Sequence, residues 1–238
     1  MDNASYTTLT RQSGLMREMQ TLANNIANAS TTGFRAEEVM FSEHIKALGP
    51  SASSLSMATA AVRNTVDTQG TLTQTGGTFD LAIEGDGFFL IETPNGQRLT
   101  RAGAFTPNEN GDLVTADGYP VLDPGGAPVF VPQGLGSVGI GADGTISAGG
   151  QPVGQVGLVR PLEPAQMIRE SGVMFDAPDG FEAIPDGRML QGFLEASNVN
   201  PILQVSRMIE VQRAYELGQN FLDKEDERIR SVIEAMRR

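Results

Sequence analysis

The chain has 238 residues, enough for one large domain or two small ones with a proper core. It contains no cysteine, which excludes disulfides, thiolate metal sites and a cysteine nucleophile. Its formal net charge is −12, and the excess lies in residues 70–199, where 16 acidic side chains accompany 5 basic ones. Because nucleic-acid binding rests on neutralising phosphates, we expect no nucleic-acid partner. No apolar run approaches the ~18 residues of a membrane span, and the start lacks the pattern of a cleaved signal peptide.

Residues 1–33 are predicted to form an N-terminal helix. Their apolar residues recur at alternating spacings of four and three, which is typical of a helix with one apolar seam. The residues of this seam are Leu15, Met19, Leu22, Ile26 and Ala29. Small residues beside the seam would let a neighbouring helix approach closely.

The end of this helix carries an unusual run, ANNIANASTTGFR at 23–35. Asn24, Asn25 and Asn28 cover more than one helical face, and uncharged amides can bond to other chains without the cost of burying charge. A solvent-facing polar stripe is an equally good interpretation on physical grounds alone. Gly33 is predicted to end the helix in a left-handed conformation, with Phe34 folded back onto the last turn.

Residues 34–72 are predicted to be a mixed connector, and residues 73–192 a β-rich domain. Between residues 70 and 192 lie 24 of the 28 glycines. Turn dipeptides recur there, each followed by a short β-prone run, which indicates hairpins. These dipeptides are Asn95-Gly96, Asn110-Gly111, Asp117-Gly118, Asp143-Gly144 and Gly149-Gly150. The stretches 79–84 and 87–93 are predicted to be the most buried strands.

Residues 193–238 are predicted to carry a C-terminal helix, with Asn200 as its cap and Pro201 in its first turn. One row of its predicted seam recurs every seven residues and comprises Met208, Tyr215, Leu222, Ile229 and Met236. The other row alternates with it and is mixed in polarity, comprising Val205, Gln212, Gln219, Asp226 and Ile233. Asp226 and Arg230 should form a pair one turn apart.

The fold class expected from these elements is α+β. It combines paired, coiled-coil-like terminal helices with a central all-β, hairpin-rich domain. An isolated pair of such helices buries too little apolar surface to offset the entropy of ordering it. We therefore expect the ends to be largely unfolded in the monomer and to fold on assembly.

The chain contains only weak matches to catalytic, cofactor-binding and metal-binding motifs. GLGSVG at 134–139 matches a dinucleotide fingerprint, but a hairpin pattern follows it where a helix would be needed. EGDG at 84–87 and NENGD at 108–112 lack the ligand set of a calcium loop. His44 is the only histidine, and acidic pairs are common by chance on so acidic a surface. We expect no catalytic, cofactor-binding or metal-binding residue, no cofactor, and no direct membrane insertion.

The opening run resembles the N-terminal signature of bacterial flagellar axial proteins, the rod and hook family. Residues 79–122 resemble the central block of that family, and LEASNVNPI (194–202) and MIEVQRAYELGQNFL (208–222) resemble its C-terminal signature. These segments cover most of the chain in the family's order. The length and the charged ending of residues 223–238 resemble the proximal-rod members more than the distal-rod members.

The resemblance implies a structural subunit of the basal-body rod and no enzymatic activity. Family members leave the cell through the flagellar type III export apparatus without a cleaved signal, and polymerise helically into a hollow, torque-transmitting shaft across the periplasm. Their partners are copies of themselves and other rod proteins. By this resemblance, an inner seam formed by the terminal helices comprises Leu15, Met19, Leu22, Ile26, Val205, Ile209, Tyr215 and Leu222. Residues expected to shape contacts between subunits are Asn24, Asn25, Asn28, Gly33, Phe34, Asn198 and Arg213.

Two alternatives remain open from the sequence. One is a distal-rod protein of the same family. The other belongs to a different class and is a periplasmic β-rich binding protein, or a carboxylate enzyme, with accessory helices. Deleting residues 1–33 or 201–238 should abolish assembly of a rod subunit but leave the ligand binding or activity of the second class intact.

Overall fold

The computed structural model describes residues 3–46, 55–132, 134 and 136–237. The fold is α+β, with a helix near each end and a β-rich central region. The chain forms two compact units. We call residues 1–27, 37–66 and 200–238 the helical unit, and residues 28–36 and 67–199 the β unit.

The helical unit contains α1 (Asn3–Ala27), β1 (Glu37–Lys46), β2 (Leu55–Thr65) and α2 (Pro201–Met236). The strands of the β unit are β3 (Leu72–Gln74), β4 (Leu81–Glu84), β5 (Phe88–Thr93), β6 (Gly96–Thr100), β7 (Thr106–Pro107), β8 (Leu113–Val114), β9 (Val138–Ile140), β10 (Thr145–Ala148), β11 (Gln151–Gln155), β12 (Leu158–Pro161), β13 (Ile168–Ser171), β14 (Met174–Asp176), β15 (Phe181–Ala183), β16 (Arg188–Gln191) and β17 (Phe193–Glu195). A short 3₁₀ turn, η1 (Pro164–Gln166), lies between β12 and β13.

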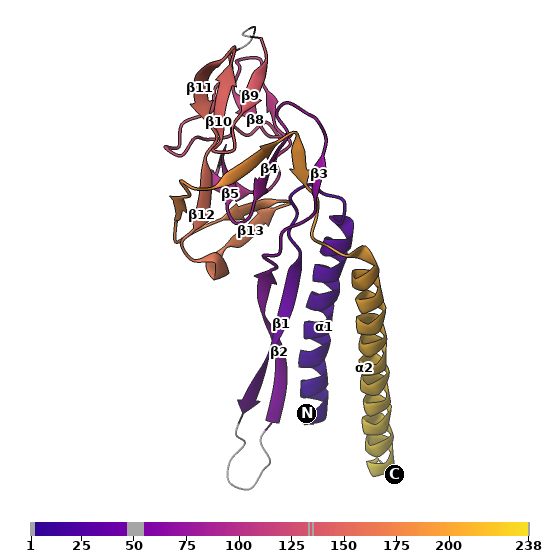
Figure 1. Cartoon of the computed structure of the whole chain (residues 1–238). Helices are drawn as coiled ribbons and strands as arrows, with labels where there is room; N and C mark the ends of the chain where they lie inside the picture. Colours follow the sequence, from indigo (N-terminus) through magenta and orange to yellow (C-terminus); the bar gives the residue numbers. More distant parts are fainter. Residues whose placement is uncertain (1–2, 47–54, 133, 135, 238) are drawn as a thin grey trace. The chain divides into compact units, whose positions relative to one another are not determined.

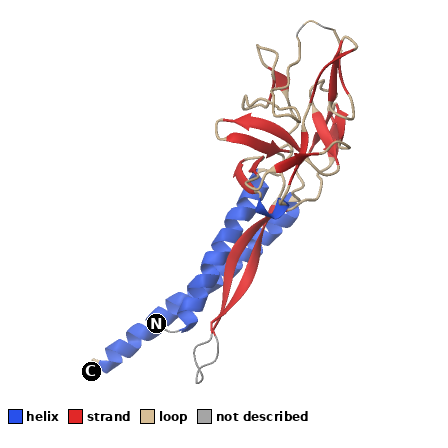
Figure 2. Cartoon of the chain, turned by 90° about the vertical axis from the view of Figure 1, so that its left-hand side faces the viewer, coloured by secondary structure: helices blue, strands red, loops and turns tan. Residues whose placement is uncertain are grey.

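In the helical unit, α1 lies between α2 and an antiparallel hairpin of β1 and β2 (Figures 1 and 2). The hairpin pairs Glu37 with Thr65 at one end and Lys46 with Leu55 at the other. Its strands occupy most of the predicted connector, and the sequence did not predict them. The Ala-rich segment of β2 has weak intrinsic β propensity, so the strands depend on pairing and on packing against α1.

The two helix boundaries follow different local rules. At α2, the Asn200 side chain accepts hydrogen bonds from the amides of Ile202 and Leu203, and the helix starts at Pro201 as predicted. α1 ends earlier than predicted, at Ala27, so neither Gly33 nor Phe34 closes its last turn. Gly33 does have a left-handed φ of +70°.

A contact within the β unit explains that glycine. A Cβ at Gly33 would lie 2.3 Å from the carbonyl carbon of Arg101 and from the amide nitrogen of Ala102. Real Cβ atoms do not approach backbone so closely, which makes the absence of a side chain at this position a requirement of packing as well as of φ.

The β unit is built around a six-stranded antiparallel sheet in the order β13-β14-β6-β5-β12-β15. Alternate residues of β5 enter two apolar clusters, because successive side chains of a strand point to opposite faces. Phe89 and Ile91 belong to the larger cluster, whereas Phe88 and Leu90 belong to the smaller one. The central strand is thus buried on both faces, which explains the unbroken apolar run 88–91 inside the stretch 87–93 that was predicted to be a buried strand.

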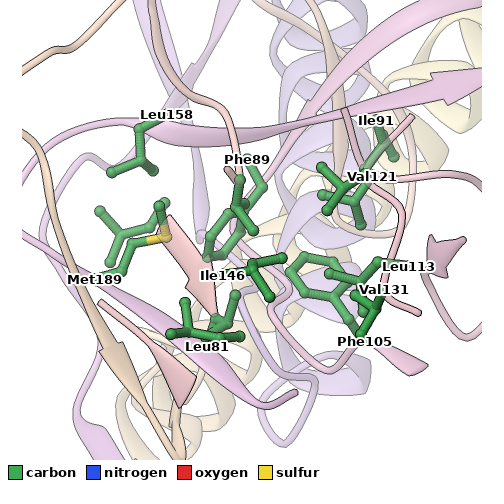
Figure 3. Close-up of a cluster of buried hydrophobic side chains, with 14 residues drawn as sticks. Leu81, Phe89, Ile91, Phe105, Leu113, Val121, Val131, Ile146, Leu158 and Met189 are labelled. Carbon is green, nitrogen blue, oxygen red and sulfur yellow. The ribbon is translucent and has the colours of Figure 1, made fainter. Parts of the chain in front are cut away.

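The larger cluster collects side chains from β4, β5, β8, β9, β10, β12 and β16 and from the intervening loops. Figure 3 shows Phe89, Phe105 and Ile146 close together within it. The rings of Phe89 and Phe105 meet edge to face, with centroids 5.1 Å apart. This cluster gives the β unit its own core.

The glycine-rich turns were predicted well. The second residue of every predicted dipeptide has a positive φ: Gly96, Gly111, Gly118, Gly144 and Gly150. The fingerprint-like run at 134–139 leads into strand β9, and therefore into a hairpin, as its sequence context predicted.

Candidate assembly interface

The packing of α1 on α2 is centred on Leu15, Leu22 and Val211, which are buried. Partly buried apolar residues surround these three side chains: Met19, Met208, Ala214 and Tyr215. Ile26 and Leu222, also predicted for the seam, are half-buried. Leu15, Met19 and Leu22 of the predicted seam therefore pack within a single chain, whereas Ala29 lies beyond the end of α1.

The seam of α2 differs from the prediction in both rows, because the row that begins at Met208 is exposed at Ile229 and Met236. Val205, Gln212 and Gln219 are exposed, and the helix turns Val211 and Gly218 toward α1 instead. Both the predicted and the observed positions fit helical periodicity. Between two seam residues that are seven apart, the intervening seam residue can lie either three or four positions after the first. The choice depends on close packing at Gly218, which the spacing of apolar residues does not reveal.

The Gln12 side chain fills the space that a side chain at position 218 would occupy. A Cβ at Gly218 would lie 2.4 Å from Gln12 Nε2, which donates a 2.9 Å hydrogen bond to the Tyr215 carbonyl. A glycine inside a helix costs roughly 0.5–1 kcal/mol relative to alanine. Its presence here is explained by this close approach between α1 and α2.

Most of the apolar surface of α2 is uncovered. Over the whole of this helix, every residue of which is described, Val211 is the one buried side chain. Ile202, Leu203 and Leu217 are 79%, 64% and 71% exposed, and the predicted seam residues Val205 and Ile209 are 45% and 46% exposed. Extended apolar patches of this kind mark interaction surfaces.

A polar cavity of about 220 Å³ lies where α1, α2 and β1 meet in the helical unit. Glu18 and Thr21 line it from α1, Glu37 and Glu38 from β1, and Arg207 from α2. Arg207 Nε donates a 2.8 Å hydrogen bond to Glu18 Oε1, and that bond is the main cause that raises the pKa of Arg207.

The asparagines near the end of α1 differ in their surroundings. Asn25 is buried, with its Nδ2 donating to the Glu37 carbonyl at 2.8 Å and its Oδ1 accepting from the Glu37 amide at 3.0 Å. The same Nδ2 lies 3.3 Å from Gln204 Oε1. Asn24 is exposed, and Asn28 accepts a hydrogen bond from the Thr31 hydroxyl. Asn25 thus ties α1, β1 and α2 together within the helical unit.

Gly33, Phe34 and Asn198 belong to the β unit. Phe34 is 1% exposed, and the Arg169 guanidinium lies 4.6 Å from its ring centroid. Asn198 Oδ1 accepts a 2.6 Å hydrogen bond from the amide of Ala36, and its Nδ2 donates to the Thr68 carbonyl at 2.9 Å. The structure therefore brings these three predicted residues together by contacts inside one chain.

A buried ionic cluster lies beside them and was not predicted. The Glu195 carboxylate is 3.2 Å from Arg35 Nη2 and 3.1 Å from Arg101 Nη1, and it accepts a 3.0 Å hydrogen bond from the amide of Gly70. The Glu195 carbonyl accepts a 2.7 Å bond from the amide of Gly33. Burial is the main cause that lowers the pKa of Arg101 to about 10.

The ionic cluster fixes the segments of the β unit at which the chain enters and leaves it. Arg35 precedes the first residue of β1 by two positions, Gly70 follows β2, and Glu195 precedes α2. Arg35 also donates to the Asp67 carbonyl. The sequence offered one sign of this cluster, because its charged residues lie inside the segments that resemble the family signatures. A single sequence does not show which charged residues pair when they are far apart along the chain.

Among the described residues, no group of three or more His, Asp or Glu side chains is arranged to hold a metal ion. None of the helices in the described part of the chain combines the length and the apolar character that crossing a bilayer requires.

Three family models match the chain. Flagella basal body rod protein matches residues 6–35, the flagellar hook protein FlgE/F/G D1 domain matches residues 82–148, and the flagellar basal body rod FlgEFG protein C-terminal matches residues 190–235. These ranges cover most of α1, the centre of the β unit, and nearly all of α2.

Curated relatives match over nearly their whole length. The flagellar basal-body rod protein FlgF of Caulobacter vibrioides is 43% identical over 246 residues, covering 99% of this chain and 98% of the relative. FlgF of Mesorhizobium japonicum is 41% identical, covering 91% and 90%, and the rod protein FlgG of Bacillus subtilis is 30% identical, covering 98% of each. The chain therefore belongs to the family of flagellar basal-body rod proteins, the structural subunits of the basal-body rod, and it is FlgF-like.

Proposed function

We propose that this chain is a subunit of the proximal rod and polymerises through α1 and α2 into the hollow shaft that transmits torque across the periplasm. The terminal helices pair in a coiled-coil-like manner in the assembled rod, and copies of this chain and other rod proteins are its partners. The subunit reaches the rod through the flagellar type III export apparatus, without cleavage of a signal. It binds no nucleic acid and catalyses no reaction.

The observation that carries this proposal is the uncovered apolar face of α2. Large side chains such as Ile202 and Leu217 lose most of the benefit of burial when they face water, at roughly 1.5–3 kcal/mol each. Neighbouring subunits that cover this face recover that free energy. A monomeric binding protein would gain no stability from an exposed apolar face.

The relatives support the proximal position within the rod. Two FlgF relatives are 41–43% identical to the chain, whereas FlgG of Bacillus subtilis is 30% identical. FlgF of Escherichia coli, at 31%, shows that members of one group can also diverge this far. The assignment therefore rests on the higher identities, together with the charged end of α2.

The predicted contact residues take two roles in this proposal. Val205, Ile209 and Arg213 are exposed on α2, and Asn24 is exposed on α1, so they face other subunits. The others act inside the subunit, by packing α1 on α2 or by fixing the segments that join the two units. These inner residues are Leu15, Met19, Leu22, Asn25, Ile26, Asn28, Gly33, Phe34, Asn198, Tyr215 and Leu222.

A pair of double variants tests the role of the exposed face. Changing Ile209 and Leu217 to Ser removes exposed apolar side chains without touching the buried seam. We expect incorporation into basal bodies to fall by about tenfold or more, because each contact contributes more than about 1.4 kcal/mol. Changing the exposed polar residues Gln212 and Gln219 to Ser is the matched control and should incorporate normally. Equal incorporation of both double variants would refute the proposal.

A further inference from the structure

The two helices of the helical unit run antiparallel and differ in length, with 25 residues in α1 and 36 in α2 (Figures 1 and 2). Gln12 Nε2 donates to the Tyr215 carbonyl, so Asn3, nine residues before Gln12, lies opposite about position 224 of α2. At a rise of 1.5 Å per residue, residues 225–236 therefore extend about 18 Å beyond the start of α1.

The seam of α2 continues into this extension with unchanged spacing. The buried and half-buried residues on the side of α2 that faces α1 recur in alternating steps of three and four: Met208, Val211, Tyr215, Gly218 and Leu222. The same steps lead through the half-buried Glu225 to Ile229, Val232 and Met236. We call these last three residues and Ile233 the terminal stripe, and all four are 40–83% exposed. The terminal stripe is an apolar seam that continues past the end of the helix that covers it.

A groove of about 300 Å³ lies between α1 and α2 at the same end of the helical unit. Leu15 lines it from α1, and Ala214, Leu217 and Phe221 line it from α2. Leu217 and Phe221 are 71% and 43% exposed, so one wall of the groove is apolar and uncovered. A cavity of about 150 Å³ holds one benzene-sized group, which gives this groove room for about two apolar side chains.

The terminal stripe and the groove cannot meet within one chain. The stripe is centred about 15 residues beyond the centre of the groove on the same helix, which is about 22 Å. Two different surfaces that complement each other between copies produce a head-to-tail contact. Such a contact propagates into an open helical polymer, whereas a symmetric contact would close on itself as a dimer.

We infer that the terminal stripe of one copy of this chain packs into the groove between α1 and α2 of a neighbouring copy. This inference rests on the proposed function and identifies the partner of one part of its interface. Apolar side chains at positions i, i+3, i+4 and i+7 form a ridge on a helix, and a groove between two helices is the shape that receives such a ridge. The neighbouring copies are then shifted by about 22 Å along their helices.

Two other exposed apolar surfaces fit the terminal stripe less well. Tyr6, Leu9 and Met16 form an exposed row on α1, but a single helix covers the stripe from one side only. The groove covers it from two helices and so removes more apolar surface from water. Ile202 and Leu203 lie about 45 Å from the stripe along α2, so a contact there would leave neighbouring helices with little shared length.

A pair of double variants in the whole chain tests the stripe. Changing Val232 and Ile233 to Ser should reduce incorporation into basal bodies by about tenfold or more, because two apolar contacts are lost together. Changing Glu227 and Glu234 to Ser is the matched control, since both are exposed on the opposite side of the same turns. The cellular amount and the circular dichroism of both variants are measured alongside. Normal incorporation of the Val232 and Ile233 variant would overturn the inference.

Cross-linking locates the partner surface without relying on a loss of assembly, and the sequence has no cysteine to interfere. Two tagged chains are expressed together, one carrying Val232→Cys and the other Leu217→Cys, and isolated basal bodies are treated with a short bismaleimide. We expect a product that joins the two tags. Ser231→Cys, on another side of α2, replaces Val232→Cys in one control, and Ser13→Cys, within the exposed row of α1, replaces Leu217→Cys in the other.

The outcomes separate the possible failures. A cross-link from position 232 to position 13 instead of 217, a cross-link only to another rod protein, or no cross-link at all would contradict the inference. If the unsubstituted chain is itself missing from basal bodies, the proposed function fails. If the chain is present and the Val232 and Ile233 variant incorporates normally, the proposed function stands and the inference alone fails.

Discussion

Replacing Glu195 with Ala should strongly destabilise the β unit. The side chains of Glu195, Arg35 and Arg101 are only 2–4% exposed, so removing the carboxylate leaves two guanidiniums buried without their counter-charge. Breaking a buried ion pair by removing one partner costs about 3–5 kcal/mol. The amide of Gly70 also loses its acceptor. We expect a loss of about 3–5 kcal/mol in the free energy of unfolding.

The measurement is urea unfolding of the full chain, combined with hydrogen exchange to separate the β unit from the helical unit. Glu195→Gln keeps the size of the side chain and an oxygen for Gly70, so its loss should be smaller and should report the charge alone. Glu182→Ala is the matched control. Its partner Arg160 is 62% exposed, and pairs at such exposure contribute about 0–1 kcal/mol. A loss below about 1 kcal/mol for Glu195→Ala would refute the reasoning.

Three further predictions concern local structure. Gly33→Ala should destabilise the β unit by more than Gly76→Ala in thermal unfolding, because both have a positive φ but only Gly33 would place a Cβ against backbone; equal losses would contradict this. Asn200→Ala should cost about 1 kcal/mol of stability in the helical unit by removing the cap of α2, measured by circular dichroism at 222 nm, and an unchanged helical signal in unfolding curves would count against it. A hydrogen bond from Arg98 lowers the pKa of Glu170 below its ordinary value. The folded state therefore binds a proton on Glu170 less readily than the unfolded state does. The stabilisation from the pair of Arg98 and Glu170 is present above the ordinary carboxyl pKa and is lost as pH falls through the lowered pKa. Glu170→Gln should flatten that part of the stability–pH curve, and an unchanged curve would exclude the pair as its source.

Local rules predicted the features that depend on near neighbours in sequence. The Asn200 cap, the ion pair between Asp226 and Arg230 at 2.6 Å, and the positive φ of the turn glycines each follow from side chains within a few residues. The apolar run at 87–93 was correctly assigned to a buried strand. In these places, propensity, pattern and tertiary structure agree.

Features that depend on distant residues were not predictable. The Glu195 cluster joins Arg35 and Arg101 to a residue far along the chain, and nothing in the spacing of charges indicates which of them pair. The choice of Val211 for the seam of α2 depends on Gln12 filling the space at Gly218. Asn25 was interpreted as a contact to other chains, but its amide is bonded to Glu37 within its own subunit.

The most direct test of the account is the protein content of detergent-resistant basal bodies. Basal bodies isolated from the source bacterium would be analysed by quantitative mass spectrometry, with the distal rod protein as the internal reference. We predict that this chain is present at a few copies per particle and at fewer copies than the distal rod protein. Its absence from these particles, with the chain recovered elsewhere in the cell envelope, would contradict the account.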